Sequence, residues 1–113
     1  MSLQIKGERS MVKLFISQPM NGKTNEEILA VRERAIESAK VYFDDEEVEV
    51  IDSFFKDAPH DAKPLWFLGK SLELLAGADV VYFAKGWRGA RGCRIENMAA
   101  VEYGIDVIED YTE

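Results

Sequence analysis

The sequence is poor in cysteine, histidine and proline, and two of these scarcities exclude whole classes of protein. Its 113 residues include one cysteine, one histidine and three prolines. The lone Cys93 cannot form an internal disulfide, which excludes a disulfide-stabilised scaffold and leads us to expect a reducing, cytoplasmic setting. The lone His60 has no partner at the spacing of metal ligands, so we predict no metal site.

The sequence also lacks a long apolar run and an excess of positive charge. No run approaches the roughly 20 apolar residues of a membrane-spanning helix, so we expect no membrane partner. Aspartate and glutamate number 21 against 14 lysines and arginines, which gives a formal net charge of -7. A protein this acidic has no general basic surface for a nucleic-acid polymer, whereas a local basic cluster can still hold a small anionic ligand.

The composition that is present is that of one globular domain. Apolar residues make up 47% and charged residues 31%, which is typical of a folded rather than a disordered chain. The first residues, MSLQIKGERS, are polar and lack the apolar core of a secretion signal. We therefore expect a flexible N-terminal extension over residues 1–11 and a single domain over residues 12–113.

Short apolar runs alternate with amphipathic stretches along this domain. Runs at 12–17, 48–51, 78–83 and 105–108 predict four strands. Helices are predicted at 25–43, from Pro64 to Gly77, and after a glycine-rich turn up to Gly104. The order βαβαβαβ predicts an α/β fold, a flavodoxin-like three-layer sandwich whose mainly four-stranded parallel sheet has the order 2-1-3-4.

Helical spacing also predicts which side chains face the core. The expected buried stripes are Ile28, Val31, Ala35, Ala39 and Tyr42 in the first helix, Leu65, Leu68, Leu72 and Leu75 in the second, and Ile95, Met98, Ala99 and Tyr103 in the third. Trp66 and Phe67 flank the second stripe, and we interpret them as core or subunit contacts.

In this strand order a ligand is expected where strands 1 and 3 lie side by side and their connections leave to opposite faces. The loop after the first strand reads SQPMNG. Its hydroxyl, amides and glycine can hold sugar hydroxyls or a phosphate, and the alternative is an ordinary turn that leads into a helix cap. The candidate binding residues of this loop are Ser17, Gln18, Pro19, Met20, Asn21 and Gly22.

The loop after the third strand reads KGWRGARGCRIE and gathers three glycines and four cations. Glycine lets the backbone approach a ligand closely, and free N–H groups at a helix start favour an anion. Arg88, Arg91 and Arg94 add positive charge to this site. The loop matches neither a dinucleotide fingerprint nor a P-loop, and the alternative is a flexible surface loop with solvated arginines. The candidate binding residues here are Gly86, Trp87, Arg88, Gly89, Arg91 and Gly92.

Glu96 follows this loop and is the candidate catalytic residue. A glutamate beside a sugar's anomeric carbon can act as a nucleophile through an oxocarbenium-like transition state. The alternative is a carboxylate that complements the dipole of the helix start. Asp52 and Ser71 are further candidates for ligand contact, with loop capping and a backbone hydrogen bond as their alternatives. Glu102 is predicted to face solvent, and Asp79, at the opposite end of its strand, is predicted to be structural.

Three segments together resemble the nucleoside 2-deoxyribosyltransferase-like family. They are FISQPMNGKT, ADVVYF, and the stretch from Gly86 through Trp87 to Glu96, and the resemblance covers the chain from about Val12 to Asp110. It implies that Glu96 is the nucleophile and that the first-strand loop lies under the sugar and base.

Two positions depart from the family pattern. Ser71 falls near the place where the characterised enzymes have an aspartate, and Arg88 and Arg91 stand in place of acidic residues that precede the nucleophile. The arginines favour a phosphorylated or otherwise anionic substrate.

The resemblance implies cleavage or exchange of the N-glycosidic bond of a 2-deoxynucleoside or its 5-phosphate, through a glycosyl–glutamate intermediate and without a cofactor. The expected partner is a small-molecule nucleoside or nucleotide. Related enzymes often complete their sites across subunits, so we also expect a homo-oligomer, most simply a two-fold dimer. The alternatives are a non-catalytic module that binds a nucleotide-derived ligand, which the missing aspartate favours, and a structural protein whose crevice is vestigial.

Overall fold

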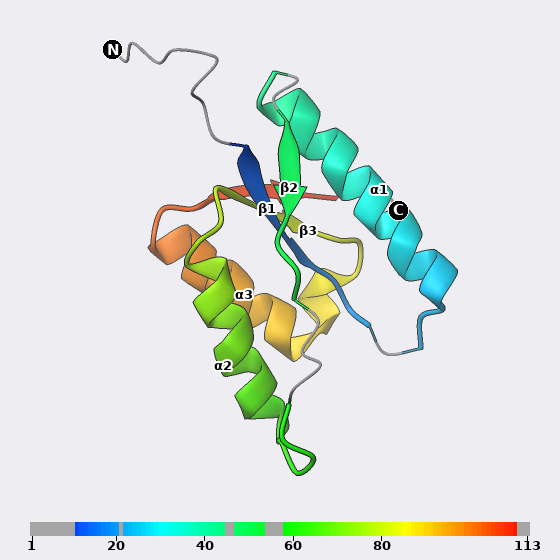
Figure 1. Ribbon diagram of the computed structural model, residues 1–113, viewed down its shortest axis with the longest axis vertical. Coiled ribbons are helices and arrows are strands. Elements are labelled where there is room, and N and C mark those ends of the chain that lie inside the picture. Colours follow the sequence, from blue (N-terminus) through cyan, green and yellow to red (C-terminus); the bar gives the residue numbers. More distant parts are fainter. Residues whose placement is uncertain (1–10, 21, 45–46, 54–57, 111–113) are drawn as a thin grey trace.

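The computed structural model describes residues 11–20, 22–44, 47–53 and 58–110. Its elements are β1 (Val12–Ser17), α1 (Asn25–Tyr42), β2 (Val48–Val50), α2 (Pro64–Leu75), β3 (Val80–Phe83), the short 3-10 helix η2 (Trp87–Gly89), α3 (Arg91–Glu102) and β4 (Asp106–Glu109). The four strands form a parallel sheet in the order β2-β1-β3-β4. Helix α1 covers one face of the sheet and helices α2 and α3 the other (Figure 1). The predicted fold class and strand order are confirmed.

Local signals in the sequence set the helix starts. The N–H of Glu27 donates to Oγ1 of Thr24 over 3.0 Å, and the N–H of Thr24 donates to Oε1 of Glu27 over 2.8 Å. This reciprocal pair is the capping box that begins α1. Pro64 occupies the first turn of α2, where its missing N–H is not needed.

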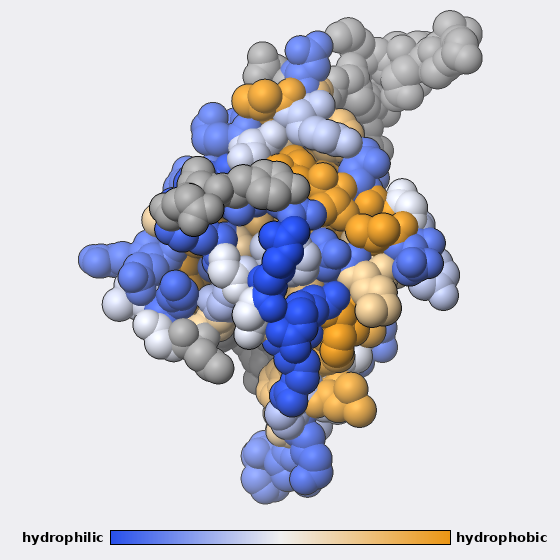
Figure 2. Space-filling model, turned by 180° about the vertical axis from the view of Figure 1, so that it is seen from behind, coloured by the Kyte–Doolittle hydropathy of each residue, from blue (hydrophilic) through white to orange (hydrophobic). Residues whose placement is uncertain are grey.

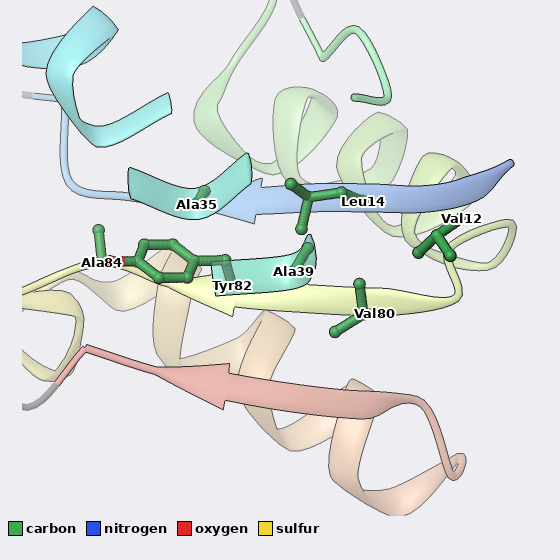
Figure 3. Close-up of a cluster of buried hydrophobic side chains, with 7 residues drawn as sticks. All are labelled: Val12, Leu14, Ala35, Ala39, Val80, Tyr82 and Ala84. Atoms are coloured by element: carbon green, nitrogen blue, oxygen red, sulfur yellow. The ribbon is translucent and has the colours of Figure 1, made fainter. Parts of the chain in front are cut away.

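The side chains of the central strands alternate between two hydrophobic cores, because successive residues of a strand point to opposite faces. Leu14, Val80 and Tyr82 project toward α1 and pack with Ala35 and Ala39 (Figure 3). Both alanines are fully buried, so α1 lies close to the sheet. All four residues of β3 are buried, as expected for a central parallel strand.

The second core lies between the sheet and the layer of α2 and α3. Phe15, Val81 and Phe83 point to this side and pack with Leu75. Ser17 lies two residues after Phe15 on the same strand and therefore projects to the same side. This alternation brings a buried hydroxyl at the end of β1 into the layer that contains α3.

Helix α3 buries a different face from the one that we predicted. Its buried residues are Cys93, Glu96 and Ala100, whereas Met98 is 64% and Tyr103 85% exposed. Apolar residues occur all round this helix, so their spacing does not identify one face. The residues next to the sheet include small ones, cysteine and alanine, which let the helix approach closely.

The predicted buried stripes of α1 and α2 are confirmed in part, and each is wrong for one residue near a helix end. Ala35 and Ala39 of α1 and Leu75 of α2 are buried as predicted, whereas Tyr42 and Leu65 are exposed. Both exceptions lie in the end turns of their helices, where the sheet no longer covers them. Within the described residues, no helix has the length and apolar character needed to cross a bilayer.

Candidate functional site

Glu96 is a buried carboxylate in the second turn of α3, with 8% of its surface exposed. The hydroxyl of Ser17, at the carboxyl end of β1, donates a hydrogen bond to Oε1 of Glu96 over 2.6 Å. The interaction of a carboxylate with the helix dipole is strongest in the first turn of the helix. Glu96 lies in the next turn and is buried, and both interpretations of this carboxylate stay predictions.

The electrostatics of Glu96 are a balance between burial and hydrogen bonding. Burial raises the pKa of its carboxyl group, because desolvation disfavours the charged form. Hydrogen bonds with Ser17 and Ser71 lower that pKa in turn, since they stabilise the carboxylate. The predicted candidate Ser71 thus lies beside Glu96, so hydroxyls from β1 and α2 converge on one carboxylate.

Cys93 lies one turn before Glu96 on the same buried face of α3. Burial raises the pKa of its thiol, and a hydrogen bond with Ser17 acts in the opposite direction. The thiol is therefore protonated near neutral pH and is not an activated nucleophile. Among the groups around Ser17, the carboxylate is the one suited to nucleophilic attack.

Glu96 lines a cavity of about 490 Å³ at the carboxyl edge of the sheet, which we call the Glu96 cavity. Six of the predicted site residues line it, namely Ser17, Gln18, Met20, Asp52, Ser71 and Glu96. They come from β1 and its loop, the end of β2, α2 and α3. The carboxyl ends of parallel strands meet at this edge, so the topology brings them together from distant parts of the chain.

The Glu96 cavity is also lined by residues that were not among the predicted site residues, and Arg32 and Phe67 are the two of most chemical interest. Arg32 reaches it from α1, and Phe67, which is 39% exposed, reaches it from α2. Phe67 was interpreted as a core or subunit contact; its exposure shows that it is not part of the described core, and the subunit contact stays a prediction. Arg32 follows Ile28 by one helical turn, so both line the cavity from the same side of α1, and the sequence alone gave no signal for this.

A second cavity, of about 420 Å³, lies at the same edge of the sheet between the loops after β1 and β3. Pro19 and Gly86 line it, and Gln18 lines both cavities. Gly86 has a φ of +85°, and a Cβ added there would lie 3.8 Å from Cγ of Pro19. Glycine therefore allows the turn after β3 that lies next to the loop after β1. Because Lys23, Lys85 and Arg34 also line this second cavity, we call it the basic cavity.

The rest of the glycine-rich turn lies outside both cavities. Trp87 is buried in the core with its ring centroid 5.1 Å from that of Phe83. Arg88 lies over the Trp87 ring at 4.6 Å and forms an ion pair with Glu109 at 3.2 Å. Its charge is therefore directed toward β4. Gly89, Arg91 and Gly92 do not belong to the described lining of either cavity.

The remaining candidates divide between turns and structural contacts. Gly22 is exposed with a φ of +77° and lines neither described cavity, and Asn21 lies outside the described residues. Asp79 accepts a hydrogen bond from the N–H of Lys13 over 2.8 Å, which agrees with its predicted structural role. Glu102 is exposed, as predicted. The described part of the chain contains no cluster of three side chains suited to a metal ion.

This arrangement can perform chemistry on an electrophilic carbon. The carboxylate is oriented by hydroxyls, is withdrawn from bulk water, and lines an open cavity that is large enough for a small molecule. Such a group can attack the carbon or stabilise positive charge that develops on it.

Comparison with known proteins identifies the fold but no family. No family model matches the chain, and no curated protein matches it significantly. Among solved structures, the crystal structure of a conserved protein from Enterococcus faecalis V583 is similar, with a TM-score of 0.64 at 17% identity. The match covers 92% of this chain and 65% of that one, so this chain spans slightly less than two thirds of its length. At this identity the likeness supports the fold alone.

Proposed function

We propose that the protein cleaves or exchanges the N-glycosidic bond of a 2-deoxynucleoside or its 5-phosphate, with Glu96 as the nucleophile. The observation that carries this proposal is the buried carboxylate of Glu96, which lines a cavity at the carboxyl edge of the sheet and accepts a hydrogen bond from Ser17. The resemblance of the loop sequences to the nucleoside 2-deoxyribosyltransferase-like family supplies the reaction class.

The reaction has two balanced steps. In the first, an oxygen of Glu96 bonds to the anomeric carbon while the carbon–nitrogen bond breaks, and its electron pair leaves with the base, which takes up a proton. The product is a glycosyl ester of Glu96. In the second step, water or a second base attacks the same carbon and loses a proton, the ester bond breaks, and the carboxylate is restored.

Ser17 and Ser71 have a supporting role in this scheme. Their hydrogen bonds oppose the rise in the pKa of Glu96 that burial causes, and so keep more of the carboxylate ionised for attack. The same charge stabilises the oxocarbenium-like transition state, in a site where burial strengthens electrostatic interactions.

The walls of the Glu96 cavity are suited to an aromatic base. Met20, Leu29 and Phe67 are partly or largely exposed apolar residues from three different segments, and all three line the cavity. A planar base can stack on such surfaces, Phe67 in particular. Arg32 can donate hydrogen bonds to an acceptor on the base or sugar from the α1 side.

A second candidate is a module that binds a nucleotide-derived ligand without turning it over. It is favoured by Ser71, which contacts Glu96 at a point where related enzymes have an aspartate. A serine hydroxyl cannot act as the same acid, so the departing base would have to obtain its proton from elsewhere.

The test of both candidates is incubation with a panel of 2-deoxynucleosides and their monophosphates, followed by chromatography for free base. Release of base supports the glycosidase or transferase, and release that requires a second base identifies transfer. Binding to the same panel without release supports the non-catalytic module. The absence of both binding and release contradicts the proposal.

We further propose that the protein acts as a homo-oligomer, most simply a two-fold dimer, in a reducing, cytoplasmic setting. Tyr82 is not available for an interface, because it is buried and its hydroxyl donates to Asp110 over 2.9 Å. The support comes instead from α3, whose exposed apolar residues are Ile95, Met98, Val101 and Tyr103. Seen from behind, hydrophobic surface gathers on the side of the molecule where α3 lies (Figure 2).

A further inference from the structure

The basic cavity joins three segments at the carboxyl ends of β1 and β3. Lys23 belongs to the loop after β1, Lys85 to the loop after β3, and Arg34 to α1. The floor contains apolar residues such as Val31 and Ala84. A pocket with an apolar floor and convergent charged groups is the usual form of a small-ligand site.

The charge of this cavity is opposite to that of the whole protein. Its lining contains three cations and one carboxylate, Glu27, in a chain with a net charge of -7. The carboxylate of Glu27 already accepts the N–H of Thr24, and Arg34 lies 3.7 Å from Asp110. Lys23 and Lys85 form no ion pair within the described part of the chain, so their charges remain for a ligand.

The arginines of the glycine-rich turn do not provide an equivalent site. Arg88 is held by Glu109 and by the Trp87 ring, and Arg94 donates to the backbone oxygen of Arg88 over 2.9 Å. The cations that line the basic cavity without an ion pair in the described chain are therefore Lys23 and Lys85, and not the arginines of this turn.

We propose that the basic cavity binds the oxyanion of a phosphate monoester or of free phosphate, with the ammonium groups of Lys23 and Lys85 as its main ligands. Lysine binds phosphate as a compact point charge with three donors. Gln18 lines both cavities, so a phosphorylated substrate held at Glu96 extends past Gln18 into the basic cavity. This last step rests on the proposed function, whereas binding of inorganic phosphate does not.

The first experiment is a titration of the ¹⁵N-labelled protein with inorganic phosphate at constant ionic strength, followed by amide shifts. The amides of Lys85 and Gly86 are expected to shift in a saturable manner. The double substitution Lys23→Ala with Lys85→Ala is expected to lower the affinity for phosphate roughly tenfold or more, because each change removes a charged hydrogen-bond donor. Lys70→Ala is the matched control, since Lys70 lies on α2 and pairs with Glu73 at 3.6 Å.

The second experiment compares a deoxynucleoside with its monophosphate as ligands. The lysine variants are expected to lose affinity for the monophosphate while affinity for the nucleoside is retained. If the lysine variants lose affinity for inorganic phosphate but not for the monophosphate, the basic cavity is a site for free phosphate that is separate from the substrate site. This conclusion does not depend on whether the protein releases base. Amide shifts on phosphate addition that are the same in the double variant and the wild type would overturn the proposal. Weaker phosphate binding in Arg91→Ala alone would also overturn it, because it would place the anion site in the glycine-rich turn.

Discussion

Glu96 is a buried ionisable residue, and such a residue needs a reason to persist, because burying a charge destabilises a fold unless hydrogen bonds replace its hydration. Ser17 and Ser71 provide those hydrogen bonds. An apolar residue at this position would stabilise the core better than the carboxylate does. Its position beside a cavity is the physical basis for assigning it chemistry rather than a structural role.

Replacement of Glu96 tests this assignment most directly. Glu96→Gln keeps nearly the same volume and can still accept the Ser17 hydrogen bond, but it removes the negative charge and the nucleophile. Base release is expected to fall by orders of magnitude while ligand binding survives. Glu102→Gln, an exposed change on the same helix, is the control. Equal rates of base release in wild type and Glu96→Gln would exclude Glu96 as the nucleophile.

The raised pKa of Glu96 predicts how stability depends on pH. The folded chain holds this proton more tightly than the unfolded chain, so the stability that Glu96 contributes is full below the ordinary glutamate pKa. That contribution is lost as pH rises through the raised value. The free energy of unfolding of Glu96→Gln relative to wild type should therefore increase with pH across this window.

Urea denaturation at a series of pH values measures this difference. Glu102→Gln should show no comparable trend, because Glu102 is exposed. If the free energy of unfolding differed between Glu96→Gln and wild type by the same amount at every pH, burial would not raise the pKa of Glu96.

At the scale of single elements, α2 serves both the core and the cavity. Leu75 at its end is buried in the core, while Phe67, nearer its start, is part of the cavity wall. The two functions are separated along the helix, so they can be tested by separate substitutions.

Phe67→Ala is expected to weaken binding of an aromatic ligand several-fold, because it removes a stacking surface. Its effect on the free energy of unfolding should be at most about 1 kcal/mol, since the side chain is 39% exposed. Calorimetric titration with a deoxynucleoside measures the first effect and urea denaturation the second. Leu65→Ala is the matched control, since Leu65 is 75% exposed on the same helix and lies outside the described lining of the cavity. The same loss of affinity in both variants would remove Phe67 from the site.

At the scale of the whole molecule, α3 presents a group of exposed apolar side chains. These side chains, among them Met98, are exposed, whereas Cys93, Glu96 and Ala100 of the same helix are buried. Burial of such a surface against a second copy of the chain would stabilise a dimer through the hydrophobic effect.

Sedimentation velocity at micromolar concentration is expected to give a dimer for the wild type and a monomer for Met98→Glu, because the new charge would be buried in the interface. Val41→Glu is the control, since Val41 is 78% exposed on α1, away from this surface. A monomeric wild type would contradict the dimer, and a dimeric Met98→Glu would place the interface elsewhere.

The sequence by itself determined the elements and their layers. Strand runs such as 12–17, the capping box at Thr24 and the proline at the start of α2 are local signals, and the alternation of strands and helices leaves few other topologies. It also identified Ser17, Asp52 and Glu96 as candidates, because residues that follow parallel strands meet at one edge. Ser71 became a candidate through its position in the family that the sequence resembles.

Only the tertiary structure decided which way the side chains at the carboxyl edge of the sheet point. The apolar residues of α3 lie all round the helix, so their periodicity did not show that Cys93, Glu96 and Ala100 face the sheet. Arg88 belongs to a turn rich in positive charge, yet it turns to Glu109, a partner 21 residues away in the sequence. Helix rotation and long-range pairing depend on the packing of the whole domain, and no local pattern in the sequence encodes them.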